Sequence, residues 1–370
     1  MAARNWEGRR HGGIGRLFRL SFGLLVAAIL LTTIVGWSRA AIACEVLGGG
    51  DPTKHEAPAT GPGARPEAQT YLTLPEWYVV FSADEYAAFL GKDRPSGFPY
   101  FRAVGQFWQA YYEVCTVAGD RYPFNSDYQL MLAVVGTSFT AENIVKGVYE
   151  NTVGRLSEWS SSGTPTPEEE FGRQVAAEYG AFIHVMPWYE FPFWSKIGPL
   201  WATTPAEPDT IRKVERRVAL TTEYVIKAGY GWAIRQGAAT VFTPEDLEIR
   251  TRAEGVTPEI AASVEGVRIA DDGAVILPRY EAFTRVMPRL VERGVSFTEI
   301  AGNDEIMLTV LAPGDWRPSG GNAEILFRMP ILTEPERTRV AIRVPVRSLH
   351  TVLGEVAGGN GAALEHIFDY

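Results

Sequence analysis

Two aromatic stretches decide how this chain is organised: FPYFRAVGQFW at residues 98–108 and FPFWSKIGPLW at residues 191–201. They lie 93 residues apart. The same distance separates EYAAFL, which begins at Glu85, from EYGAFI, which begins at Glu178. Aromatic residues make up 12% of the chain, but composition alone rarely places two motifs in one register. Self-similarity at a fixed period is typical of duplicated structural units, so the pairs predict an internal repeat.

A third pair follows after a shorter loop. TAENIVKGVY (140–149) and TTEYVIKAGY (221–230) share the pattern T-x-E-x3-K-x2-Y. All three motifs come in the same order in both halves, and apolar residues recur at helical spacing around them. We therefore expect a duplicated all-α domain over residues 71–240, with repeat 1 at about 73–160 and repeat 2 at about 166–238, packed about a pseudo-twofold axis.

The N-terminus carries an uncharged run, LSFGLLVAAILLTTIVGW at residues 20–37. Arg9, Arg10, Arg16 and Arg19 precede it. About 17–25 apolar residues suffice to cross a bilayer, and arginine on one side of the run keeps that side cytoplasmic. We expect a cytoplasmic tail (1–19), a single-pass transmembrane anchor (20–37) and an extracytoplasmic body, which would be periplasmic in a bacterium.

Two other fates of this segment stay open. Residues 41–43 read Ala-Ile-Ala, which fits the small-residue site after which signal peptides are cleaved. Cys44 follows directly, as in a lipoprotein. We favour the uncleaved anchor because the apolar run is long for a signal peptide and because Trp37 and Arg39 interrupt its end.

Charge and cysteine content exclude several classes of protein. The net charge is −9, and residues 1–43 contain six Arg and one Glu, so the remainder carries −14. An acidic body does not suit nucleic-acid binding, which needs a basic surface. The two cysteines, Cys44 and Cys115, lack metal-ligand spacing. We expect no metal, no cofactor and a free buried Cys115, with a Cys44–Cys115 disulfide as the alternative.

The remaining segments differ in composition and in hydrophobic pattern. Residues 38–70 are rich in Gly, Pro and Ala and predict a flexible linker. Residues 241–266 hold two short helix-start signals, TPE at 243 and TPE at 257, and predict a connector. Residues 267–370 alternate β-branched runs with two helical patterns in the order β-α-β-β-β-β-α-β. That order predicts an α+β sandwich close to a ferredoxin-like fold.

Charged residues fall on apolar faces of two predicted helices. On a helical wheel, each stripe contains the Glu, Lys and Tyr of the third motif, and Arg216 joins the second stripe. Buried charges are costly unless they are paired. The stripes therefore predict either a polar pocket between the repeats or ion pairs that dock the two helices. The candidate residues are Glu142, Lys146, Tyr149, Arg216, Glu223, Lys227 and Tyr230.

The most aromatic segment, PWYEFPFWSKIGPLW at 187–201, contains Trp188, Trp194 and Trp201. Tryptophan combines an apolar ring with a polar N–H and is enriched where membrane meets water. The segment is thus a candidate membrane or partner contact, with core packing as the alternative.

Two functional hypotheses remain. The first is a membrane-anchored protein whose exported body binds or scaffolds a lipid-like or protein partner. The second is an enzyme that acts on an apolar or anionic small molecule in a Glu/Lys/Tyr pocket between the repeats. The sequence contains no GxSxG, Walker A or HExxH motif, and no GxGxxG motif after a predicted strand. It therefore does not indicate a particular reaction.

Overall fold

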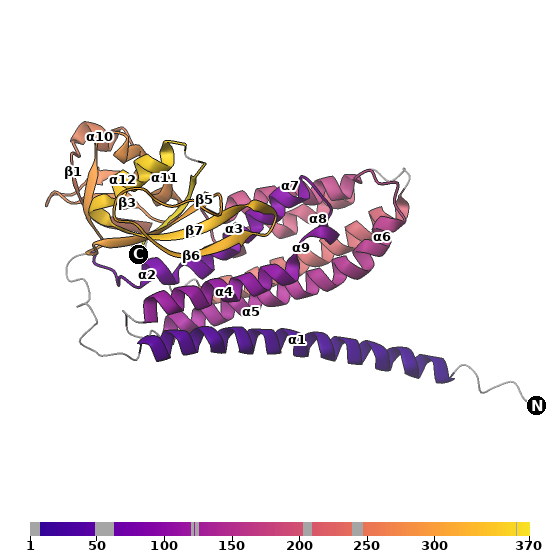
Figure 1. Ribbon diagram of the computed structural model, residues 1–370. Helices are drawn as coiled ribbons and strands as arrows, with labels where there is room; N and C mark the ends of the chain where they lie inside the picture. The colour runs from indigo at the N-terminus through magenta and orange to yellow at the C-terminus, as the bar shows by residue number, and fades with distance from the viewer. Residues whose placement is uncertain are drawn as a thin grey trace, which may run out of the picture.

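The computed structural model describes residues 8–48, 63–119, 122, 126–202, 209–238, 247–359 and 361–370. A long N-terminal helix, α1, runs along one side of a helical bundle, and a smaller α+β part packs against the other side near one end (Figure 1). The described elements thus include a helical bundle and strands that follow it in the sequence, as expected.

Helix α1 (Gly8–Gly48) is 41 residues long. Its segment Arg19–Cys44 is long and apolar enough to cross a membrane. The helix continues eleven residues beyond the predicted span, because no Gly or Pro interrupts it between Trp37 and Gly48. The start of the predicted linker is therefore helical, and residues 49–62 lie outside the described part.

The end of α1 is fixed to the bundle. Gly36, Ala40 and Ala43 are buried, and Cys44 forms a disulfide with Cys115. The expectation of a free Cys115 was wrong. The two cysteines are 71 residues apart in sequence, and only the packing of α1 along α4 brings their Cα atoms within 4.5 Å.

The bundle contains two helical groups. The first consists of α3 (Leu74–Leu90), η2 (Pro95–Gly97), α4 (Tyr100–Gly119), α5 (Ser126–Tyr149), a π-helical turn η3 (Glu150–Gly154) and α6 (Arg155–Trp159), preceded by the short α2 (Gln69–Leu72). The second consists of α7 (Pro167–Ile183), η4 (Trp188–Glu190), α8 (Phe193–Ala202) and α9 (Thr210–Ala238). In the second group α7, η4 and α8 each begin 93 residues after α3, η2 and α4.

The aromatic stretch at residues 98–108 lies in and just before α4, and its side chains pack against glycines of α5. Tyr100 and Phe107 are buried. A Cβ atom on Gly136 would lie 2.6 Å from Phe107, and one on Gly147 would lie 2.9 Å from Tyr100. The small residues therefore let α4 and α5 approach closely.

The strands form two antiparallel sheets, with orders β2-β3-β1-β4 and β6-β7-β5-β8. The strands are β1 (Glu248–Glu254), β2 (Arg268–Ile269), β3 (Val275–Pro278), β4 (Ser296–Ile300), β5 (Glu305–Ala312), β6 (Glu324–Ile331), β7 (Glu334–Pro345) and β8 (Ala363–Phe368). The helices among them are α10 (Pro258–Ala262), α11 (Glu281–Val291) and α12 (Leu349–Ala357).

From residue 267 onward every predicted strand and helix is present in the predicted order, but the short β2 precedes them and was not predicted. A ferredoxin-like fold is not confirmed, because the strands divide between two sheets. Strand β1 lies inside the predicted connector and pairs with both β3 and β4. Its sequence, EIRTRAE, has few apolar residues, so the pattern did not predict a strand. Of the two connector helix signals, the second gives α10, and the first lies outside the described residues.

The sheet β6-β7-β5-β8 is covered on both faces. Ile306, Leu308 and Val310 of β5 join the core that contains α11 and α12. Met307 of the same strand, with Phe368 of β8, joins the core of α3 and α4. Alternate residues of a strand point to opposite faces, so one sheet serves both cores. The two cores thus meet at this sheet, and the predicted domain boundaries stay a prediction.

Candidate functional site

The predicted charged stripes face each other across α5 and α9. Lys146 Nζ donates to Glu223 Oε1 at 2.9 Å, and Lys227 Nζ lies 2.7 Å from Glu142 Oε1. Each lysine therefore pairs with the glutamate of the other helix, although Lys227 also lies 3.3 Å from its own neighbour Glu223. Because residue numbers rise along α5 as they fall along α9, the two helices are antiparallel.

A tyrosine from each EY motif completes this cluster. Lys146 Nζ lies 4.3 Å from the ring centre of Tyr86 on α3. Lys227 Nζ lies 4.8 Å from the ring centre of Tyr179 on α7. Ammonium groups are attracted to the faces of aromatic rings. Tyr86 and Tyr179 were missed as site residues, although the repeated EY motif that contains them was the available signal.

Burial and charge set the protonation of this cluster. Burial is the largest influence on Glu223 and by itself raises the pKa, but Lys146 and Lys227 together lower the pKa of Glu223 to about 2. Burial raises the pKa of Tyr179 to about 12. Glu223, Lys146 and Lys227 are thus charged near neutral pH. The phenols of Tyr86 and Tyr179 stay protonated.

Tyr149 and Tyr230 of the predicted set also join α5 to α9. Tyr149 OH donates to Glu215 Oε1 at 2.7 Å. The hydroxyl groups of Tyr230 and Ser138 lie 2.9 Å apart.

Arg216 Nη1 donates to Glu150 Oε1 at 2.9 Å in the π-helical turn. It belongs to a buried ionic network at this end of the bundle. Fully buried Arg212 contacts Glu158 at 3.0 Å and Glu169 at 2.7 Å. The network was not predicted, because its glutamates come from separate helices.

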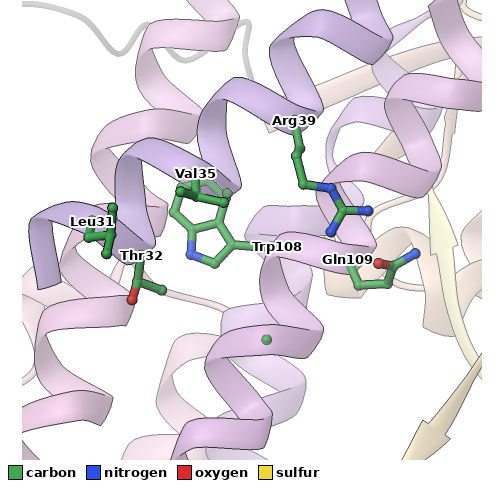
Figure 2. A pocket seen from close by; sticks show the side chains of 8 residues that line it. Leu31, Thr32, Val35, Arg39, Trp108 and Gln109 are labelled. Atoms are coloured by element: carbon green, nitrogen blue, oxygen red, sulfur yellow. The ribbon is translucent and has the colours of Figure 1, made fainter. Parts of the chain in front are cut away.

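The charged groups of the predicted set pair with protein groups, and a polar pocket between the repeats stays a prediction. A pocket among the described residues lies elsewhere. Figure 2 shows it between α1 and α4, where Val35 of α1 lies beside the indole of Trp108. Within the described part of the chain, the α5–α9 cluster is therefore an ionic seam between two helices.

The predicted tryptophan contact is partly at the surface. Trp194 and Trp201 of α8 are exposed. Trp188 is half-buried, with its ring centre 5.2 Å from that of Tyr230.

Apolar side chains are also exposed along α5 and α9. On α5 they include Leu130, Val134, Val145 and Val148; on α9 they include Ile211, Val214, Val218, Val225, Ile226 and Trp232. Helical spacing places most of these residues on one stripe of each helix. We call the two stripes together the apolar outer face of α5 and α9; α1 packs on α5.

A second titratable cluster joins the bundle to the α+β part. His184, which caps α7, lies between two carboxylates: its Nε2 is 2.6 Å from Asp84 Oδ2 on α3, and its Nδ1 is 3.2 Å from Glu281 Oε2 on α11. These hydrogen bonds raise the pKa of His184 to about 9. Burial lowers the pKa of His366, whose ring lies 3.6 Å from that of Trp77 at a tilt of 35°. Of these two histidines, His184 is therefore the one that is charged near neutral pH.

Among the residues described, no three His, Cys, Asp or Glu side chains are placed to hold a metal ion. No protein-family model, no curated protein and no solved structure matches the chain. We therefore infer the function from the geometry of the described residues.

Proposed function

We propose that this is a membrane-anchored protein whose helical bundle lies on the extracytoplasmic side, packs against the membrane-spanning helix α1 and binds an apolar partner. The observation that carries the proposal is the apolar outer face of α5 and α9 beside α1. Monomeric soluble proteins rarely expose contiguous apolar patches larger than a few hundred Å², and larger ones mark contacts with proteins or membranes. The exposed Trp194 and Trp201 add amphipathic rings of the kind favoured at such contacts.

The disulfide supports the exported location. Disulfides persist in oxidising compartments and are rare in the cytosol. Cys44 lies at the end of α1 away from the arginine-rich tail, so an oxidising environment there agrees with the orientation that the arginines favour. A Cys44 in a disulfide also has no free thiol for a lipid thioether, so the proposal is an anchor that remains part of the chain.

The proposal includes duplication of the helical unit. Its support is that contacts recur at the same offsets. Phe98 packs edge-on against Tyr86 with ring centres 5.0 Å apart, and Phe191 packs against Tyr179 at 5.3 Å. The reciprocal ion pairs of the α5–α9 seam are those expected of a twofold axis between two antiparallel copies.

The enzyme alternative receives no support from the seam. Catalytic carboxylates and lysines must reach a substrate, whereas Glu142, Lys146, Glu223 and Lys227 pair with one another. We therefore propose binding rather than catalysis.

Single-cysteine labelling tests the anchor and the export. Both native cysteines are in the disulfide, so one added cysteine is the only free thiol. In intact cells of an exporting host, a membrane-impermeant maleimide should label Gln174→Cys on the exposed face of α7. It should label Leu24→Cys in α1 only after detergent is added. Labelling of Leu24→Cys in intact cells, or protection of Gln174→Cys until lysis, would contradict the proposal.

A further inference from the structure

We infer that α8 and α9 form a docking groove for an apolar helix of another polypeptide, equivalent to the groove in which α4 and α5 hold α1. The inference rests on the proposed duplication, and it identifies the kind of partner that the exported bundle binds.

The two grooves share a hydrogen bond at their base. Trp108 Nε1 on α4 donates to Thr140 Oγ1 on α5 at 2.9 Å. Trp201 Nε1 on α8 donates to Thr221 Oγ1 on α9, also at 2.9 Å. The tryptophans are 93 residues apart and the threonines 81, the offsets of the aromatic and the Glu/Lys motifs. Trp108 and Trp201 therefore hold equivalent places in the two helical groups.

In the first groove α1 covers this tryptophan. A Cβ on Gly36 of α1 would overlap the indole of Trp108, and Figure 2 shows the ring against α1. Trp108 is accordingly 6% exposed, whereas Trp201 is 52% exposed. Ile144 of α5 is 8% exposed, whereas its counterpart Val225 of α9 is 42% exposed. No described helix covers the second groove as α1 covers the first.

The exposed stripe beside Trp201 is nonetheless apolar, although the guanidinium of Arg217 lies 5.7 Å from the Trp201 ring centre. Ile211, Val214, Val218, Val225 and Trp232 recur along α9 at intervals of three, four and seven residues and form one stripe. The exposed face of α7 shows what water-facing positions in this bundle carry, because it bears Glu170, Gln174 and Glu178. The stripe on α9 is thus typical of a face that packs against another apolar surface.

An apolar helix is the occupant that fits, because α1 fills the equivalent groove. This molecule's own α1 is tied to the first groove by the disulfide at Cys115, so another chain must supply the second helix. Its direction follows from the fold. Helix α1 is parallel to α4, since Gly36 meets Trp108 and Cys44 meets Cys115. Helices α4 and α8 are antiparallel, so the docked helix should run opposite to α1.

Site-specific photo-cross-linking of the full chain in its native membranes tests this. A photoreactive phenylalanine replaces Val218 or Val225, and Gln174 on the polar face of α7 is the control position. We expect one discrete adduct from both α9 positions and none from position 174. Mass spectrometry should place the cross-linked site in an apolar segment of 18 or more residues in a different polypeptide, oriented opposite to α1.

A matched pair of variants tests the role of the groove. Trp201→Ala should lower the yield of this adduct about tenfold, as loss of a tryptophan anchor does in interfaces. Trp159→Ala, which removes an even more exposed tryptophan (77%) at the end of α6, should leave the yield unchanged. An adduct at twice the chain mass would show a second copy, and lipid adducts alone would show a lipid surface. Either result, or no adduct, would overturn the inference. The cysteine-labelling result for the anchor would stand independently.

Discussion

The two ion pairs of the α5–α9 seam should differ in strength, because they differ in burial. The side chains of Lys146 and Glu223 are 17% and 23% exposed, whereas Glu142, the partner of Lys227, is 43% exposed. Removing one partner of a buried pair leaves an unpaired charge and costs about 3–5 kcal/mol, while exposed pairs contribute about 0–1 kcal/mol. The Lys146–Glu223 pair is partly buried, so we expect a coupling energy between these limits, about 2 kcal/mol. For the more exposed Lys227–Glu142 pair we expect less than about 1 kcal/mol.

Two double-mutant cycles measure these energies. One uses Lys146→Met and Glu223→Gln, and the other uses Lys227→Met and Glu142→Gln. Urea unfolding at neutral pH gives the free energy of unfolding of each single and double variant, and the non-additive part is the coupling. Methionine keeps most of the apolar stem of lysine, so packing changes little. If the couplings are equal, or if the exposed pair is the stronger, burial does not govern this seam and the reasoning fails.

Two further predictions concern contacts elsewhere in the protein. Trp108→Ala should lower the free energy of unfolding by about 3–5 kcal/mol, as for a buried aromatic side chain. Trp201→Ala should cost about half as much in the purified protein, because about half of this residue is already exposed to solvent. Equal losses in urea unfolding would contradict the assignment of an uncovered groove. The pKa of His184 is about 9 in the folded protein, compared with 6.5 for an unperturbed histidine. The interactions of its charged form therefore stabilise the fold fully below about pH 6.5, and this stabilisation is lost as the pH rises through 9. His184→Gln should remove that loss, so an unchanged pH dependence between 6.5 and 9 in the variant would show that another group is responsible.

Much of the helical part could be predicted because its signals are local. The capping box of α7, in which Thr166 and Glu169 bond to each other's backbone N–H groups, follows from the TPEE sequence. The stripes of α5 and α9 follow from helical periodicity. That Glu142 pairs with Lys227, and Glu223 with Lys146, depends on how the helices pack, which wheel geometry does not specify.

The features that were missed depend on long-range packing or weak patterns. The Cys44–Cys115 bond requires α1 to lie along α4, and no local signal indicates that. Strand β1 has few apolar residues and is held by its pairing to β3 and β4. Trp108 is covered and Trp201 is exposed because α1 packs only on the first helical group. The aromatic motifs around the two tryptophans match, so they do not predict this difference.

Intact mass spectrometry of the protein extracted from membranes of an exporting host tests whether α1 remains a disulfide-linked anchor. We expect the mass of a chain that retains residues 19–44, less the two hydrogens lost when Cys44 and Cys115 form their disulfide. We also expect the protein to remain in the membrane fraction after an alkaline wash. A chain that begins at Cys44, a lipid-modified Cys44, or two free thiols in the exported protein would contradict it.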